Sequence, residues 1–141
     1  MLRLIRRWSS WWLIFPRRYI DTDYPWENFD LEEWSKDFEW ELDPWDGVYD
    51  HAQYPAETVE KGSGDCVDYA AVAASYLYAT TDHELTLCYH AGRKGRSVQA
   101  HMTIFDETAG TLYSSGRIRE MTPDEYNEGR VYSRLFTRKI R

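Results

Sequence analysis

The chain has 141 residues, of which 43% are hydrophobic and 16% aromatic, and its formal net charge is −7. This length suits one globular domain that buries about two-thirds of its unfolded surface. The negative charge argues against a general nucleic-acid-binding protein, because such a protein needs a basic surface.

Cysteine usage and hydropathy favour a cytoplasmic protein. The two cysteines, Cys66 and Cys88, are too few for a disulfide framework, although a bridge between them stays open. No stretch approaches the ~20 apolar residues of a membrane span, and the apolar run 11–15 is too short for a signal-peptide core. Arginine outnumbers lysine thirteen to four. An acidic, lysine-poor surface is what we expect in a high-salt cytoplasm, where hydrated carboxylates keep a protein soluble.

Residues 1–18 form a basic, aromatic arm with five arginines and no acidic residue. Its apolar residues recur at the spacing of one helical face, and Pro16 ends the run. Such a helix docks on the domain's own core, docks on a partner protein or lies in a membrane interface. We favour docking, since a surface helix with one apolar face is the commonest case. Residues 19–141 then form a single domain.

Residues 21–50 reverse the charge, with twelve acidic residues against Lys36 alone, and contain four tryptophans. The segment predicts a helix from about Asp30 to Leu42, ending before Pro44. Its acidic residues form either a solvated face or a groove for basic substrates, and the solvated face is the simpler interpretation.

A glycine-rich turn within PAETVEKGSGDCVDYA, residues 55–70, leads into an alanine-rich helix. Gly62 and Gly64 permit a tight backbone path, and apolar residues at helical spacing predict a helix from Cys66 to about Ala79. The second half of the chain then predicts an antiparallel sheet.

Alternating apolar residues indicate strands over 85–90 and 97–105, separated by a glycine- and arginine-rich loop. A short strand follows at 111–115, Thr122 caps a short helix, and 131–140 forms a basic final strand. Helices followed by this sheet give an α+β fold.

Cys66 lies where a helix can activate a thiol. Ser63 or Asp65 can cap the helix, and the positive end of the helix dipole favours the reactive thiolate. Two backbone N–H groups in the first turn can receive a developing oxyanion. The alternative is that Cys66 is a small buried hydrophobic residue.

A cysteine nucleophile also needs a base, and four histidines are available: His51, His83, His90 and His101. His83 lies in a polar turn, where we expect it to be solvated, and His51 lies in a loop before the motif. His101 lies near the start of a strand expected to pack against the Cys66 helix. His101 is therefore the geometric candidate.

The group that orients His101 is expected on the next strand. Asp106 lies five residues further on, about 16 Å away and on the opposite face. The register expected across the turn places Ser115 opposite His101, and a one-residue slip places Ser114 there instead. A hydroxyl can hold an imidazole tautomer, but it stabilises imidazolium less than a carboxylate does.

This arrangement resembles the transglutaminase-like superfamily, including the bacterial transglutaminase-like cysteine proteinases. Residues 55–70 are similar to the family's P-x-E-T-L and G-x-G-D-C-x-D-x-A signature almost position for position. His101 opening a strand matches a second, weaker block, and the likeness covers about residues 45–116. It implies a papain-like fold and a Cys–His–Asp triad, with Cys66 as nucleophile and His101 as base.

The sequence departs from the family pattern at the third member, where Ser114 or Ser115 replaces the aspartate. We interpret the two aspartates beside Cys66 as structural residues that cap or tie down the turn. The second oxyanion donor stays open between Gln53 and Trp45.

Two functions fit these residues. In the first, Cys66, His101 and Ser115 catalyse thiol-dependent acyl transfer or amide hydrolysis on a peptide or protein substrate. In the second, the fold persists without turnover, and the groove between helix and sheet binds a peptide. A metal site from Cys88, His90 and His101 lacks supporting ligand spacing, so we expect neither metal nor cofactor. Cys88 and His90 are more simply strand residues on the less buried side of the sheet.

Overall fold

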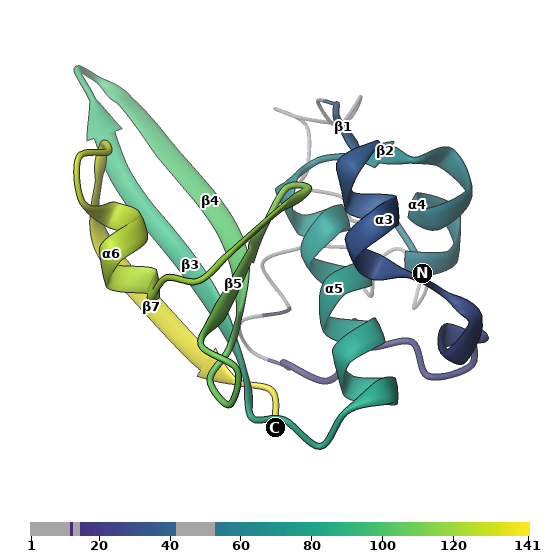
Figure 1. The fold of residues 1–141 in the computed structure, drawn as a ribbon. Coiled ribbons are helices and arrows are strands. Elements are labelled where there is room, and N and C mark those ends of the chain that lie inside the picture. Colours follow the sequence, from purple (N-terminus) through teal and green to yellow (C-terminus); the bar gives the residue numbers. More distant parts are fainter. Residues whose placement is uncertain (1–11, 13–14, 42–52) are drawn as a thin grey trace.

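The computed structural model describes residues 12, 15–41 and 53–141. Figure 1 shows helices gathered on one side of an antiparallel sheet and a short helix on the other side. The fold is therefore α+β, as expected. The elements ahead of the sheet are η1 (Trp26–Asn28), α3 (Leu31–Lys36), β1 (Glu39–Trp40), α4 (Pro55–Lys61), β2 (Ser63–Gly64) and α5 (Cys66–Thr80).

The first helix is shorter than its sequence pattern predicts. Asp30 caps α3 by accepting a hydrogen bond from the Glu33 N–H at 3.1 Å, but the helix ends at Lys36 rather than near Leu42. The next residues form β1, which pairs in parallel with β2. Backbone pairing with a distant segment therefore overrides the local helical pattern.

Helix α5 begins at Cys66 as predicted and ends one residue beyond the expected Ala79. Residues 69–74 are fully buried, and four of the six are alanine. Such small side chains let the sheet and the other helices approach α5 closely. Consequently α5 is the central element of the core.

The sheet has five antiparallel strands in the order β6-β5-β4-β3-β7. β3 and β4 run through most of the expected glycine–arginine loop and form the long hairpin of Figure 1. The short strand β6 was not predicted. The remaining elements are β3 (Leu85–Lys94), β4 (Ser97–Asp106), β5 (Thr111–Ser114), β6 (Arg117–Arg119), α6 (Pro123–Asn127) and β7 (Tyr132–Lys139).

The two faces of the sheet are both covered. Leu87 pairs with Ile104 on the face that packs in the core with α5. Cys88 and His90 lie on the opposite face, and both have no exposed surface. The expectation that these two residues lie on a less buried side is therefore wrong. Rings and polar groups from α6 and β7 cover this second face, which the alternation of a single strand does not reveal.

Part of the N-terminal arm packs in the core. Trp12 is fully buried, stacks on Tyr19 with ring centroids 5.3 Å apart, and donates from Nε1 to the Pro16 carbonyl at 2.7 Å. Arg17 donates from Nε to the Ile140 carbonyl at 3.2 Å. For these residues the arm docks on the domain, and the rest of 1–14 lies outside the described residues.

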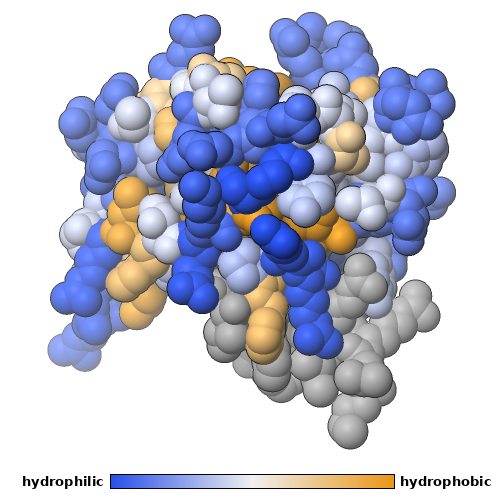
Figure 2. All heavy atoms as spheres, turned by 90° about the horizontal axis from the view of Figure 1, so that it is seen from below, coloured by the Kyte–Doolittle hydropathy of each residue, from blue (hydrophilic) through white to orange (hydrophobic). Residues whose placement is uncertain are grey.

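Hydrophilic residues dominate the surface. Figure 2 shows the molecule from below, where hydrophobic residues are visible only in small areas between hydrophilic ones. Around α3, Glu32, Glu33 and Asp37 are exposed, which fits the solvated acidic face. Within the described residues, no helix has the length and apolar character needed to cross a membrane.

The turn between β5 and β6 connects the sheet to the helices. Buried Tyr69 on α5 shares a hydrogen bond with Ser35 at 2.8 Å, and the backbone of Gly116 also bonds the Tyr69 hydroxyl. The rings of Trp34 and Phe38 pack on Tyr69, with centroids 5.9 and 5.1 Å away. This contact holds the hairpin one helical turn from Cys66.

We predict that Gly116→Ala destabilises the protein more than Gly95→Ala. Both glycines have positive φ, but a Cβ at Gly116 lies 2.9 Å from the Ser35 carbonyl oxygen, whereas nothing lies within 4 Å at Gly95. The free energy of unfolding should fall by about 1 kcal/mol at Gly95 and by about 2–3 kcal/mol at Gly116. Urea denaturation of both variants measures this, and equal losses contradict tight packing at Gly116.

Candidate active site

A capping box fixes the start of α5. The Asp65 carboxylate accepts from the Asp68 N–H, and the Asp68 carboxylate accepts from the Asp65 N–H, both at 3.0 Å. Gly64 gives this box room, since a Cβ there lies 2.7 Å from the Asp68 side chain. The two aspartates therefore hold the turn that presents Cys66, which agrees with their interpretation as structural residues.

Gln53 supports the same turn and is not available as an oxyanion donor. Its backbone N–H donates to Asp68 at 2.6 Å, and its side-chain amide donates to Asp68 at 2.9 Å and to the Ser63 carbonyl at 3.4 Å. The other candidate, Trp45, lies outside the described residues. The cap takes the Asp68 N–H, so this N–H is not available to a ligand at the helix start.

His101 is oriented by Ser114 rather than by Ser115. Its Nε2 lies 2.8 Å from Ser114 Oγ. The expected register is wrong by one residue because Asp106, not Phe105, pairs with Thr111, so the turn between them has four residues instead of five. Ser115 instead forms the turn before β6 with φ of 43°.

Hydrogen bonding through Ser114 selects one imidazole tautomer. Ser114 Oγ donates to the Tyr126 hydroxyl at 3.5 Å, so the same oxygen accepts from the His101 Nε2–H. The lone pair of His101 is then on Nδ1. In this tautomer, Nδ1 of the neutral ring can accept a proton.

An aromatic cluster surrounds His101. The rings of Tyr126 on α6 and Tyr132 on β7 stack on His101 with centroids 5.6 and 6.2 Å away. Neither tyrosine was singled out from the sequence. The sequence patterns of α6 and β7 carry no signal that these two tyrosines pack on His101.

Burial keeps His101 neutral. Burial, together with the charges of His90 and Arg130, lowers the pKa of His101 to about 4. Burial also lowers the pKa of His90, whose nitrogens bond Asn127 at 2.6 Å and Thr103 at 2.8 Å. At neutral pH His101 is therefore unprotonated and able to accept a proton.

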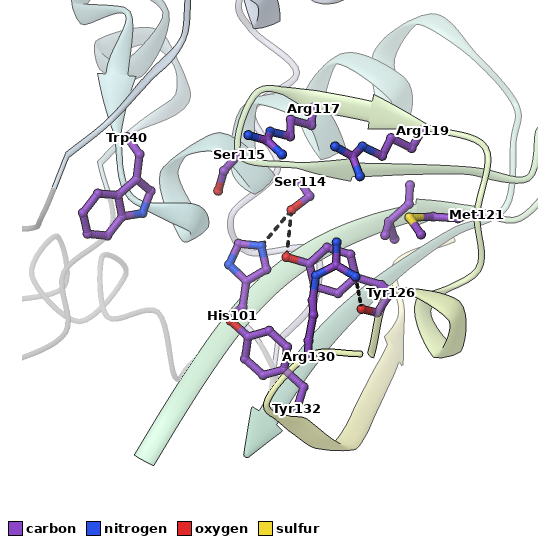
Figure 3. A pocket seen from close by; sticks show the side chains of 11 residues that line it. Trp40, His101, Ser114, Ser115, Arg117, Arg119, Met121, Tyr126, Arg130 and Tyr132 are labelled. Carbon is purple, nitrogen blue, oxygen red and sulfur yellow. Dashed lines mark hydrogen bonds between the residues drawn. The ribbon is translucent and has the colours of Figure 1, made fainter. Parts of the chain in front are cut away.

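A cavity of about 380 Å³ opens beside His101. Figure 3 shows His101 and Ser114 at its centre, with arginines reaching in from both sides. The residues that line it are Trp40, His101, Leu112, Ser114, Ser115, Arg117, Arg119, Met121, Tyr126, Arg130 and Tyr132.

Tyr132 stacks on His101 and lies within electrostatic range of Cys66. Burial raises the pKa of Tyr132, and the charges of Tyr126 and Cys66 raise it further. On the cavity's far wall, Trp40 pairs with Gly64, two residues before Cys66. Cys66 is partly exposed and forms no disulfide, and it is not among the described residues that line the cavity. His101 pairs with His90, so its side chain lies on the sheet face opposite the one that packs with α5.

The other reactive side chains are placed differently. Cys88 is a free, buried thiol, and burial raises its pKa to about 12, which makes it unreactive. His83 is not simply solvated, because its Nδ1 lies 2.6 Å from the buried Asp106 carboxylate. His51 lies outside the described residues.

No protein-family model, curated protein or solved structure matches the chain. Among the residues described, no group of three or more His, Cys, Asp or Glu side chains could hold a metal ion.

We predict that His101 makes stability depend on pH. The folded pKa of about 4 lies below the ordinary value of about 6.5, so the unfolded chain binds more protons between these values. Stability is then full above pH 6.5 and declines as the pH falls toward 4. Between pH 7 and 5 the free energy of unfolding should fall by about 2 kcal/mol from this residue.

Urea denaturation at pH 5 and pH 7 tests this expectation, with His101→Gln as the comparison. The variant should lose most of the difference and retain the part that comes from His90. An unchanged pH dependence in His101→Gln contradicts a buried, neutral His101.

Proposed function

We propose that the protein catalyses thiol-dependent acyl transfer or amide hydrolysis, with Cys66 as the nucleophile and His101 as the base. One observation carries the proposal: a neutral His101 bonds Ser114 beside a cavity whose wall includes Trp40, and Trp40 pairs with Gly64, two residues before Cys66. This arrangement supports the base that a cysteine nucleophile requires.

In the proposed reaction, His101 Nδ1 takes the proton of the Cys66 thiol as the sulfur attacks the amide carbon. The N–H groups at the start of α5 stabilise the oxyanion. The C–N bond then breaks, and the amine leaves with the proton from His101. Water or a second amine, deprotonated by His101, attacks the thioester carbon and releases Cys66.

Ser114 makes this base weaker than one supported by a carboxylate. A hydroxyl adds no negative charge to offset the imidazolium that forms during attack. Burial and the nearby positive charge of Arg130 also disfavour the protonated ring. We therefore expect slow turnover.

The second candidate is a peptide-binding module with the same fold. It is favoured by the hydrogen bonds of His101, since in the described part of the chain its ring nitrogens bond Ser114 and no carboxylate. A neutral imidazole beside an open cavity also serves binding without chemistry. The reactivity of Cys66 separates the two candidates.

We predict that iodoacetamide alkylates Cys66 much faster at pH 7 than it alkylates a small-peptide thiol. Because His101→Gln removes the base, alkylation of Cys66 should be roughly 10–100-fold slower in this variant. His83→Gln is the matched control, because His83 bonds Asp106 elsewhere in the sheet. Mass spectrometry of the labelled chain gives the rate at each cysteine. A Cys66 no faster than the peptide thiol, or indifferent to His101→Gln, contradicts the enzyme.

We predict that Ser114→Asp strengthens the base. A carboxylate at the Ser114 position lies against His101 Nε2, so it should raise the pKa of His101 by roughly 1–3 and speed alkylation of Cys66. The control is Ser115→Asp, which adds the same charge one residue away. NMR titration of the imidazole measures the pKa. Equal effects of the two substitutions contradict the orienting role of Ser114.

A further inference from the structure

The cavity beside His101 has a charge opposite to that of the protein. Three arginines line it, Arg117, Arg119 and Arg130, and none of its described lining residues is acidic. The chain as a whole has 24 acidic residues and a net charge of −7. This cavity therefore concentrates positive charge on an otherwise acidic protein.

Two of these arginines have no ion-pair or hydrogen-bond partner among the described residues. Arg117 and Arg119 are alternate residues of β6, so their side chains leave the strand on one face. Both are exposed, and in the described residues neither forms an ion pair or a side-chain hydrogen bond. In Figure 3 both reach over the cavity from the side opposite Arg130. Guanidinium groups in this arrangement suit a carboxylate, which they bind through paired N–H donors.

Arg130, in contrast to Arg117 and Arg119, is held in place by contacts with Tyr126. Its guanidinium lies over the Tyr126 ring, 4.1 Å from the centroid, and donates to the Tyr126 carbonyl. Ser115 adds a further donor to the same wall, since its Oγ is buried and has no hydrogen-bond partner in the described structure. The cavity therefore combines fixed and unused donors for an anion.

The opposite wall offers an apolar surface. Trp40 lines the cavity with 59% of its surface exposed. A volume of about 380 Å³ suits one or two side chains of a peptide and is at the small end of ligand sites. A nucleic-acid strand is disfavoured, because the protein's net charge of −7 repels a long polyanion.

We infer that this cavity binds an acidic peptide, with Arg117 and Arg119 holding a Glu or Asp carboxylate and Trp40 contacting the adjoining residue. The claim that this peptide is a substrate rests on the proposed function, whereas the claim that it binds does not. A carboxylate there also places a negative charge near His101, which faces His90, Arg130, Tyr126 and Tyr132. The substrate thereby supplies the charge that Ser114 lacks.

Equilibrium binding to the full chain carrying Cys66→Ser tests the inference, because this variant cannot react through the thiol. The probes are the peptide acetyl-Ala-Glu-Gln-Glu-Ala-amide, the same peptide with both Glu replaced by Gln, and inorganic phosphate, each measured by calorimetry. We expect the acidic peptide to bind at least ten times more tightly than the neutral peptide and more tightly than phosphate.

Combined Arg117→Gln and Arg119→Gln substitutions should remove this preference, while the two Lys substitutions should retain part of it. Arg93→Gln is the matched control, since Arg93 is an exposed arginine of the β3–β4 hairpin. Equal affinity for the two peptides, a preference that survives Arg117→Gln and Arg119→Gln, or phosphate binding as tight as the acidic peptide overturns the inference.

The two proposals fail independently. An inert Cys66 together with selective binding of the acidic peptide removes the enzyme and keeps the acidic ligand. A reactive Cys66 without that selectivity keeps the enzyme and removes the acidic ligand. NMR titration adds a direct readout: the acidic peptide, and not the neutral one, should raise the pKa of His101 above its value of about 4.

Discussion

The site depends on the contact between the β5–β6 turn and the middle of the helical layer. Tyr69 is fully buried on α5, and its hydroxyl is bonded by Ser35 from α3 and by the backbone of Gly116 from the turn. These partners satisfy the polar tip of a large buried ring, as burial requires. Because Ser114 is two residues from Gly116, the same contact fixes the hydrogen-bond partner of His101 against the helical layer.

Burial has opposite consequences for the groups of this region. It makes Cys88 inert by raising the pKa of its thiol, while it keeps His101 neutral by lowering the pKa of its imidazole. A neutral imidazole accepts a proton, yet positive neighbours such as Arg130 disfavour the imidazolium that results. The site as it stands thus favours weak base catalysis, and an anion bound nearby is the simplest way to strengthen it.

Local sequence signals were sufficient to predict where a helix begins when the hydrogen bonds that cap it come from the same segment. Asp65 and Asp68 cap each other, so the start of α5 was predictable to the residue, and Thr122 likewise begins α6. His101 and its strand followed from alternation. The hydrogen-bond partner of His101 was expected to be Ser115, or Ser114 after a one-residue slip, and it is Ser114. The turn has four residues rather than five, and this register puts Ser114 on the face of His101, two residues along from the position directly opposite it.

By itself, the sequence determined the helix that begins at Cys66, the strand that carries His101 and the α+β class, because capping and periodicity act between residues close in the chain. Only the tertiary structure decided which serine meets the imidazole, how α6 and β7 bury His90 and stack tyrosines on His101, and which arginines share a cavity. Those outcomes depend on strand register and on the packing of segments far apart in the sequence. Residue spacing does not encode them, since each depends on the shape of the surface on which a segment packs.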